Sequence, residues 1–438
     1  MGLLFVGNKL MEKEVSINKS YNLPKETQLI IHDSNYVVVY TEGCNWLLFN
    51  KETYKIYQFF EKKHTIKEAY TLFDNNLVNN VIREIEAKNF ENCINTEQHE
   101  EKSVFIYLTN NCNLRCPYCY MYSGELIIQE LELEQWKAIL LELSKNGYKN
   151  ITFSGGEPLL YKSFKELCIF ANTLGFNICV LSNGILWDDK LISELSGSIS
   201  EVQLSLDGYD CASYKFVRDY DGFDKVLDTL DKLDKLGIFT SLSVTPLYEK
   251  LDNFINHYKD FALFLNERYP NTQIKFSYEL MPGRTIKISK EENQIYRSSI
   301  TNLVREIDSD YFDDNFYINL KTKQRITSCG YGGLTISSEG KVYLCNRIFS
   351  DKSVGEITKG NIQELENIAK NSMDDKSLSN VYPCAKCPLK YICGGGCRLE
   401  FKENKNPKIK YKYIRACSNE NRKIFLDRMI SANEYFYE

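Results

Sequence analysis

The chain has 438 residues, of which 43% are hydrophobic, and it therefore holds enough apolar material for two or three packed domains. Its formal net charge of −5 combines 54 basic with 59 acidic residues and leaves no basic field, which argues against a nucleic acid partner. The opening apolar run is too short for a signal peptide, and no stretch approaches about 18 uninterrupted apolar residues. We therefore expect a cytoplasmic protein without a membrane partner.

The chain is rich in cysteine, with 15 residues, and poor in histidine, with 4. In a large chain without a targeting segment, cysteines bind metal or take part in chemistry more often than they form disulfides. The histidines are scattered, which argues against a zinc or copper site built on imidazole. Thiolate-ligated iron is the best remaining use of the cysteines.

Residues 18 to 92 read as three strands followed by three helices. The predicted strands lie at 29–31, 36–40 and 46–49, and the predicted helices at 51–60, 66–73 and 77–90. The segment is therefore winged-helix-like. A polar stretch, 95–102, is a candidate linker.

From residue 104 the sequence alternates strand, loop and helix, with helix ends predicted at Gly147, Gly175 and Gly237. The six predicted strands cover residues 104–108, 151–153, 176–181, 202–206, 239–244 and 274–278. This alternation predicts a parallel barrel or part of one, with its chemistry on loops at the carboxyl ends of the strands.

Cys112, Cys116 and Cys119 follow the first of these strands directly. Three thiolates can hold a 4Fe-4S cubane and leave its fourth iron without a protein ligand. A zinc site is the alternative, but it would need a fourth cysteine or histidine nearby, and the surrounding sequence offers none. Cys168 and Cys179 fall on apolar faces and are expected to be core residues.

The spacing of these cysteines and the motifs that follow resemble the radical S-adenosylmethionine (SAM) superfamily, over residues 103 to about 280. The resemblance implies that SAM binds the open iron and is cleaved to a 5'-deoxyadenosyl radical. It also implies SAM contacts at strand ends, namely Tyr118, Gly155, Gly156, Glu157, Ser182, Asn183, Ser205, Asp207 and Arg218. Pro246 either shapes the adenine pocket or forms an ordinary turn.

Seven cysteines between residues 329 and 417 resemble the SPASM extension of peptide-modifying radical SAM enzymes. The resemblance implies two auxiliary 4Fe-4S clusters, and so three clusters in all. Cys329, Cys345 and Cys397 would hold the first auxiliary cluster, and Cys384, Cys387, Cys393 and Cys417 the second. A pair of zinc knuckles is the alternative, although seven thiols cannot close two four-coordinate sites.

Fully ligated relatives carry an eighth cysteine shortly before the first, but residues 319–328 contain none. The first auxiliary cluster would then keep an open iron that can bind a substrate thiolate. Alternatively, an aspartate, water or a distant cysteine fills the place.

The N-terminal segment resembles the leader-peptide recognition element of enzymes that mature ribosomally made peptides, in which a precursor adds a strand to a sheet edge. A DNA-binding role is disfavoured because the segment is not basic. A structural appendage or a dimerisation module are the other interpretations. The family further implies a flavodoxin or ferredoxin-type electron donor.

Together these features predict an α/β protein with three domains: a peptide-recognition domain over 1–100, a partial (β/α)6 radical SAM barrel over 101–315, and a SPASM domain over 316–438. The predicted activity is that of an oxidoreductase of the sactipeptide or ranthipeptide maturase type, which joins a cysteine sulfur to a carbon of the precursor. Glu279 or Tyr278 would move a proton, and Arg284 would orient the substrate. Alternatives are a carbon-carbon crosslink, formylglycine formation in a sulfatase, or a non-catalytic electron carrier that binds peptides.

Overall fold

The computed structural model divides into two compact units. Unit 1 comprises Met1–His99, Phe312–Cys329 and Met373–Glu438, and unit 2 comprises Glu100–Tyr311 and Gly330–Ser372. The described residues are 3–4, 15–92, 101–124, 129–309, 325–326, 330–347, 353–358, 360–405, 409–413, 417 and 419–437. The domain boundaries expected near residues 100 and 315 stay a prediction, but both ends of the chain fall in one unit.

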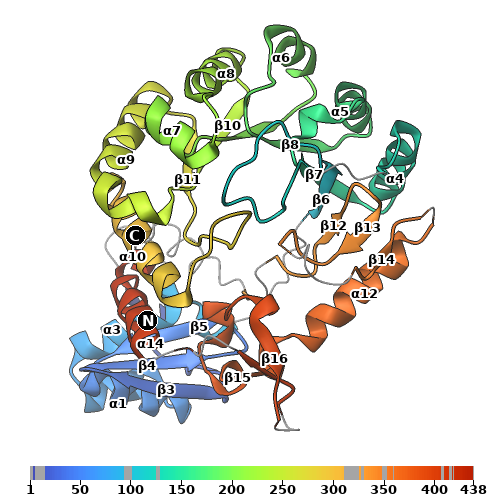
Figure 1. Ribbon diagram of the computed structural model, residues 1–438. Helices are drawn as coiled ribbons and strands as arrows, with labels where there is room; N and C mark the ends of the chain where they lie inside the picture. Colours follow the sequence, from blue (N-terminus) through green and yellow to red (C-terminus); the bar gives the residue numbers. More distant parts are fainter. Residues whose placement is uncertain are drawn as a thin grey trace. The chain divides into compact units, whose positions relative to one another are not determined.

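Unit 2 is built on a 9-stranded sheet with the order β11-β10-β9-β8-β7-β6-β12-β13-β14. Six neighbouring strands run parallel, and they are β6 (Lys102–Thr109), β7 (Tyr148–Gly155), β8 (Asn177–Ser182), β9 (Glu201–Ser205), β10 (Phe239–Val244) and β11 (Gln273–Phe276). The six predicted strands are confirmed as elements, with ends that differ by a few residues. Figure 1 shows them in a curved row with helices on its outer side.

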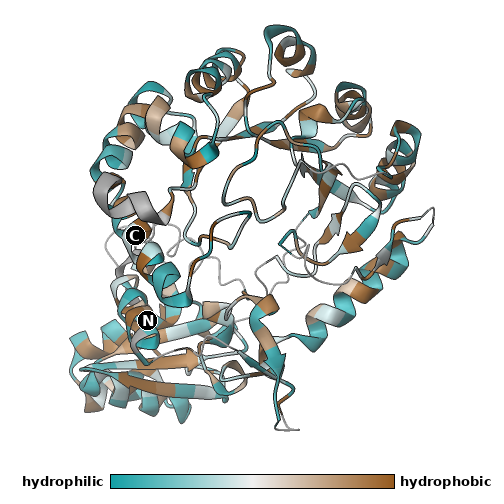
Figure 2. Ribbon diagram, viewed as in Figure 1, coloured by the Kyte–Doolittle hydropathy of each residue, from teal (hydrophilic) through white to brown (hydrophobic). Residues whose placement is uncertain are grey.

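The helices of unit 2 bury apolar stripes against this sheet, as in α8, where Val226, Leu230 and Leu233 are buried. They are α4 (Leu133–Lys145), α5 (Phe164–Thr173), α6 (Asp189–Leu195), α7 (Cys211–Arg218), α8 (Phe223–Lys235), α9 (Tyr248–Arg268) and α10 (Lys290–Ile307). Figure 2 shows the hydrophobic strands inside and polar residues on the outer helix faces. The predicted stops at three glycines are confirmed, because α4, α5 and α8 end just before them. Among the described residues, no helix is long and apolar enough to cross a bilayer.

The sheet continues past β6 into residues from much later in the chain. β12 (Leu334–Ile336) pairs in parallel with β6, β13 (Lys341–Tyr343) pairs antiparallel with β12, and β14 (Gly355–Glu356) pairs with β13. The chain then enters α12 (Ile362–Asp375). Cys345 lies just after β13, and the buried Tyr107 of β6 donates a hydrogen bond to the carbonyl of Asn346 at 2.9 Å. The sheet therefore fixes the Cys345 loop within unit 2.

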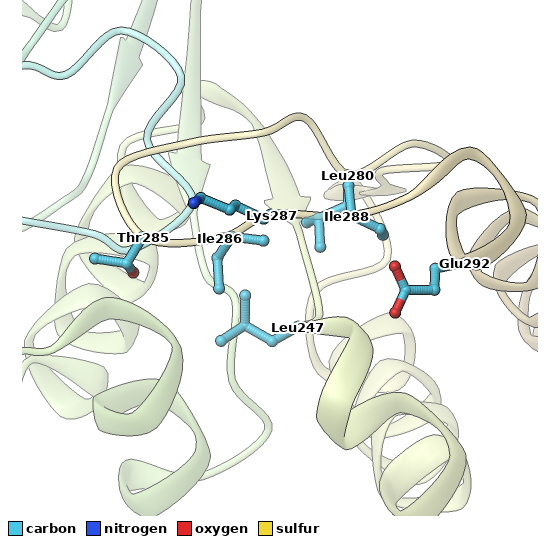
Figure 3. Close-up of a pocket in the computed structure, with 7 residues that line it drawn as sticks. All are labelled: Leu247, Leu280, Thr285, Ile286, Lys287, Ile288 and Glu292. Carbon is cyan, nitrogen blue, oxygen red and sulfur yellow. The ribbon is translucent and has the colours of Figure 1, made fainter.

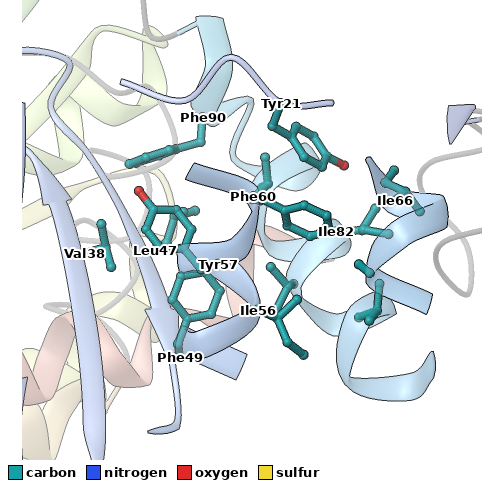
Figure 4. Packing of buried hydrophobic residues seen from close by; sticks show 14 of the residues in the cluster. Tyr21, Val38, Leu47, Phe49, Ile56, Tyr57, Phe60, Ile66, Ile82 and Phe90 are labelled. Atoms are coloured by element: carbon teal, nitrogen blue, oxygen red, sulfur yellow. The ribbon is translucent and has the colours of Figure 1, made fainter. Parts of the chain in front are cut away.

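Unit 1 contains the predicted three-stranded sheet and three helices. They are β3 (Thr27–His32), β4 (Asn35–Tyr40), β5 (Asn45–Phe49), α1 (Lys51–Glu61), α2 (Ile66–Leu72) and α3 (Asn75–Ala87), preceded by β1 (Leu3–Leu4) and β2 (Val15–Ser16). The sheet is antiparallel with the order β3-β4-β5. One face packs on the three helices through Val38, Leu47 and Phe49, and Figure 4 shows this core around Tyr57 and Phe60.

The opposite face of the same sheet packs against the C-terminal end of the chain. Strand side chains alternate between faces, so Val37, Val39 and Trp46 point away from the first core and contact Leu426 and Met429 of α14 (Asn419–Ser431). At the β3–β4 turn, His32 Nε2 lies 2.6 Å from Asp427 Oδ1 of α14. The C-terminal helix is thus part of the N-terminal fold.

Short elements carry most of the C-terminal cysteines in unit 1. A small sheet of β15 (Val381–Tyr382), β17 (Tyr411–Tyr413) and β16 (Phe401–Glu403) flanks α13 (Lys390–Cys393) and several single-turn helices. Cys44, from the loop before β5, packs with Cys384, Tyr391 and Phe401. The cysteine-rich segment and the N-terminal sheet therefore share a core.

Candidate active site

The cysteine loop leaves the carboxyl end of β6, at the edge of the parallel sheet where sequence reasoning placed it. Cys116 is buried, whereas Cys112 and Cys119 are partly exposed. Burial raises the pKa of the Cys112 thiol to about 11, and the nearby Glu157, Cys116 and Cys119 raise it further. The three predicted ligands therefore converge in space, where a metal centre would stabilise their thiolates.

Backbone amides point at several of the predicted ligand sulfurs. The amide of Leu114 donates to Cys112 Sγ at 3.4 Å, and the amide of Arg347 donates to Cys345 Sγ at 3.4 Å. Cys393 likewise accepts a hydrogen bond from the backbone of Gly395. In each case the donor lies two residues after the cysteine. Amide hydrogen bonds to sulfur are typical of iron-sulfur ligation, so these residues fit the expected clusters.

Arg115 fixes the shape of the cysteine loop. Its guanidinium donates to the carbonyls of Cys112 at 2.6 Å, Leu114 at 3.0 Å and Gly124 at 2.9 Å. Because one planar group joins three backbone positions, the loop holds its form around the sulfurs.

The Gly155-Gly156-Glu157 segment packs directly on this loop. The amide of Gly156 donates to Thr109 at 2.8 Å, and the amide of Glu157 donates to Asn111 at 2.7 Å. A Cβ atom on Gly156 would lie 2.2 Å from the carbonyl oxygen of Asn111. Only glycine allows this approach, which is the structural reason for the predicted motif.

Glu157 is fully buried and is hydrogen-bonded to two other predicted SAM contacts. Its carboxylate accepts hydrogen bonds from Ser182 Oγ and from the amide of Asn183, both at 2.8 Å. Burial raises the pKa of Glu157 to about 7, against the lowering effect of these hydrogen bonds. The Asn183 side chain also donates to Asn113 of the cysteine loop at 2.8 Å. The group sits where a cationic ligand would favour its ionised form.

Asp207, just after β9, is buried and accepts hydrogen bonds from residues of four different segments. Its carboxylate accepts from Arg218 Nε at 2.7 Å, from the Thr245 amide at 2.7 Å and from the Tyr118 hydroxyl. Tyr258 of α9 donates to its carbonyl at 2.9 Å. Three predicted SAM contacts, Tyr118, Asp207 and Arg218, are therefore bound to one another. The fourth residue of this region, Ser205, is half-buried at the end of β9.

The segment of residues 283–288, which follows β11 and is called the strap below, packs on the cysteine loop. The amide of Thr285 donates to the carbonyl of Pro117 at 2.9 Å, and Arg284 donates to the carbonyl of Ser123 at 2.6 Å. Behind the strap lies a cavity of about 320 Å³ lined by Leu247, Leu280, Thr285, Ile286, Lys287, Ile288 and Glu292. Figure 3 shows Leu247 and Ile286 pointing toward each other across it. The cavity therefore combines apolar walls with Lys287 and Glu292, and one of its lining residues, Thr285, also bonds the cysteine loop.

The predicted proton-transfer residues lie in the loop just beyond β11. Glu279 Oε2 is 3.5 Å from the Arg347 guanidinium and 3.7 Å from that of Arg297. Tyr278 is its neighbour in the chain. Since Arg347 also donates its amide to Cys345, Glu279 is linked to a predicted auxiliary ligand.

The four cysteines assigned to the second auxiliary cluster converge within unit 1. Burial raises the pKa of Cys384 to about 11, with further raising by Cys393, Cys387 and Cys417. In the first auxiliary set, Cys329 lies outside the described residues, Cys345 belongs to unit 2 and Cys397 to unit 1. That grouping stays a prediction. Cys168 is buried in the core, as expected, and Cys179 is half-buried in β8.

Several contacts of the site were missed by sequence reasoning. Thr245 directly follows β10, so the strand-end rule could have found it. Asn113 lies inside the cysteine loop itself. Tyr258 and Trp187, which donates to Ser182 Oγ at 3.1 Å, carry no signal in a single sequence because their roles depend on helix and loop placement.

Known proteins share both the sequence and the fold of this region. Residues 106–261 match the family model of the Radical SAM superfamily. The sporulation killing factor maturation protein SkfB of Bacillus subtilis (strain 168) is 39% identical over 145 residues, which is 33% of this chain and 35% of that protein. The cysteine-type anaerobic sulfatase-maturating enzyme of Clostridium perfringens (strain 13 / Type A) is 29% identical over 346 residues, which is 69% of this chain and 90% of that protein.

A solved structure, native anSMEcpe with bound AdoMet and Cp18Cys peptide, has a TM-score of 0.58 at 20% identity and covers 76% of this chain and 100% of that one. At this identity the likeness concerns the fold alone. The chain spans 35% to 49% of the length of the first four curated relatives that it matches. The likeness to the Radical SAM superfamily therefore concerns residues 106–261, and the rest of the chain lies outside the matched segment.

Proposed function

We propose that this protein is a radical SAM peptide maturase that forms thioether crosslinks in a ribosomally made precursor peptide. The observation that carries the proposal is the cysteine loop at the carboxyl end of β6, locked against Glu157, Ser182 and Asn183. It unites three thiols with a buried carboxylate in the segment that matches the radical SAM family.

Cys112, Cys116 and Cys119 would hold the first cluster, which when bound supplies the low-potential electron that cleaves SAM to the 5'-deoxyadenosyl radical. Glu157 would accept hydrogen bonds from the SAM amino group. Such donors would offset the free-energy cost of keeping a buried carboxylate ionised. Arg218 would meet the SAM carboxylate. Asp207 accepts a hydrogen bond from Arg218 Nε. A guanidinium has four further N–H donors, so Arg218 can bind Asp207 and the SAM carboxylate at the same time.

The recess behind the strap supports an adenine site. Apolar side chains, Leu247, Leu280 and Ile286, line it beside the loop that carries Tyr118. A flat heterocycle favours such walls, with a few polar groups to fix its orientation.

β3 supports the recognition of a peptide. It lies at the edge of its sheet and pairs with β4 alone among the described strands, while its Leu29 and Ile31 side chains are 40% and 59% exposed. The other edge, β5, is engaged, because the amide of Leu48 donates to Glu84 at 2.7 Å. An extended leader peptide could therefore add to β3 through backbone hydrogen bonds.

The cysteines of the C-terminal region support the thioether step. Cys329, Cys345 and Cys397 would leave a coordination position for a substrate thiolate, and Glu279 would accept the thiol proton. Closure of the carbon-sulfur bond is a net oxidation, and the site of Cys384, Cys387, Cys393 and Cys417 would take up the electron. SkfB, a maturation protein, is in line with such a role.

The test is co-expression with a cysteine-containing precursor, such as one encoded beside the gene, followed by mass spectrometry. A thioether removes two hydrogens and one alkylatable thiol per ring. The Cys345→Ala variant should still cleave SAM but leave every thiol alkylatable. Retained thiols together with a loss of two hydrogens in the wild type would instead establish a carbon-carbon crosslink and refute the thioether.

A second candidate is oxidation of a sulfatase cysteine to formylglycine. It is favoured by the relative from Clostridium perfringens, which this chain matches over 90% of that protein's length. Incubation with a sulfatase-derived cysteine peptide separates the two, because formylglycine would appear as an aldehyde and no crosslink would form.

A further inference from the structure

Arg398 is a buried cation beside the second cysteine site, and it directly follows Cys397 of the first auxiliary set. Only 2% of the residue is exposed, and it follows the Gly394-Gly395-Gly396 run that separates Cys393 from Cys397. Its guanidinium donates to the carbonyl of Gly394 at 3.2 Å and to that of Gly396 at 2.7 Å. The guanidinium therefore holds the carbonyl groups of Gly394 and Gly396 pointing toward it.

One amide of the glycine run meets a cysteine, that of Gly395 at Cys393, while the amide of Gly394 donates to the carbonyl of Lys390 at 2.9 Å and ends α13. Gly394 and Gly395 have φ angles of +73° and +71°, and the backbone of Gly395 donates to Cys393. A Cβ atom would lie 2.2 Å from Ile326 at Gly394 and 2.1 Å from Tyr413 at Gly396, so no side chain fits there. The glycines therefore let the backbone turn tightly beside Cys393.

The charge of Arg398 acts on the sulfurs through this same packing. Its guanidinium binds the carbonyls on either side of Gly395, whose backbone meets Cys393, and Cys384 also lies within reach of its charge. In a water-excluded interior a positive charge is weakly screened, so its influence is far larger than that of an exposed charge.

Arg422 offers the matched comparison. It lies near Cys417, where its charge favours the thiolate, but the residue is exposed on α14. The two arginines therefore place the same charge beside one cysteine site, Arg398 in the interior near Cys384 and Cys393 and Arg422 in water near Cys417.

We propose that Arg398 sets the reduction potential of the cluster held by Cys384, Cys387, Cys393 and Cys417, stabilising its reduced form so that it accepts the electron released by crosslinking. The inference rests on the proposed function. When the substrate carbon radical joins the thiolate sulfur, one electron must leave, and a cluster held by these four cysteines would take it up; the thiol proton would have left before this step. A four-thiolate cluster gains negative charge on reduction, and a buried guanidinium favours that state.

The test is a potentiometric titration of the full chain, reconstituted with iron and sulfide, monitored by electron paramagnetic resonance. At a fixed solution potential, Arg398→Gln should lower the ratio of reduced to oxidised second cluster at least tenfold, a shift of about 59 mV for one electron. Arg422→Gln should change it less than twofold, and the cluster of Cys112, Cys116 and Cys119 serves as the internal reference. Arg398→Lys, which keeps the charge, should recover most of the wild-type ratio.

Equal ratios in Arg398→Gln and wild type, or equal shifts in Arg398→Gln and Arg422→Gln, would overturn the proposal. If Arg398→Gln fails to hold iron, the decision passes to Arg398→Lys, which should keep the iron with less than a threefold change in ratio. Loss of iron from both would mean that the arginine only holds the loop, and would also overturn it. If the wild-type protein binds only enough iron for the Cys112 site, both the auxiliary clusters and the role of Arg398 are refuted. If it binds three clusters but Arg398→Gln leaves the reduction potential unchanged, only the role of Arg398 is refuted.

Discussion

The two cysteine sites of this protein are built in different ways. The loop of Cys112, Cys116 and Cys119 leaves a long central strand and is locked by groups at the ends of β7 and β8. The site of Cys384, Cys387, Cys393 and Cys417 is made of single-turn helices and a glycine run around Arg398. Sulfur in both accepts amide hydrogen bonds, so the local chemistry is shared while the support differs.

The difference in support has a thermodynamic consequence. The parallel sheet can form without a metal, because its strands bury an apolar core of their own. The second site has only short elements, and its apolar residues, such as Leu378 and Val381, pack in small clusters instead of against a long sheet of its own. Binding of a metal there would supply a larger share of the folding free energy. The first site is therefore expected to control chemistry, and the second to control both stability and electron transfer.

The largest expected effect breaks the first site alone. Cys116→Ala removes one of three thiolates, and reductive SAM cleavage should fall to the level of a control without enzyme, since the cluster loses the geometry that binds SAM. The midpoint of thermal unfolding should stay close to that of the iron-free wild type. Measurement of 5'-deoxyadenosine by chromatography checks the first result. Cleavage at a tenth of the wild-type rate or more would refute the ligand assignment.

Cys384→Ala tests the opposite behaviour at the second site. Unit 1 should lose at least about 3 kcal/mol of stability relative to the loaded wild type, or roughly 6–12 °C in Tm for a unit of this size. Uncoupled SAM cleavage should persist. Differential scanning calorimetry measures the change, and the exposed Cys211→Ser provides a control that alters neither property. An unchanged Tm would show that the second site, like the first, is supported by the fold alone.

Local sequence patterns predicted the helices and strands of both units, but not which of these elements pack against one another. The strands near residues 104, 151 and 202 are apolar runs bounded by turns, and the helix stops are glycines, so short windows sufficed. The packing of α14 on the sheet of β3, β4 and β5 joins segments hundreds of residues apart, and the period of a pattern does not identify its partner.

The candidate site shows the same division between local and distant information. Cysteine spacing and the Gly155-Gly156-Glu157 turn predicted the cysteine loop and the segment that packs on it, because both are contiguous motifs. Asp207 and Arg218 were each assigned to SAM, yet they form a buried ion pair with each other. Their pairing depends on how α7 folds back over the end of β9, which spacing in the sequence does not encode.

That ion pair predicts the third largest effect. Asp207→Asn should cost about 3–5 kcal/mol in the free energy of unfolding, because Arg218 would keep a buried charge without a counterion. Urea unfolding measures the loss. Asp228→Asn, which disrupts partly exposed pairs with Lys225 and Lys232, serves as the matched control and should change the free energy of unfolding by less than about 1 kcal/mol. Similar losses in both variants would show that burial does not strengthen the Asp207–Arg218 pair.

The smallest expected effect concerns Glu157, whose pKa is raised by burial from 4.5 to about 7. Between these two values the folded chain keeps a proton that the unfolded chain has released, so the free energy of unfolding should fall as pH rises. At about 1.36 kcal/mol per pKa unit, the fall is at most about 3 kcal/mol and levels off above pH 7. Glu157→Gln lacks this titration, so the wild-type and variant stabilities measured without SAM should converge or cross between pH 5 and 7. Parallel pH profiles would mean that the carboxylate remains ionised in the folded chain. SAM, whose amino group would donate hydrogen bonds to the ionised carboxylate, should in turn bind the wild type more tightly as pH rises through 7, because binding then no longer has to displace the proton.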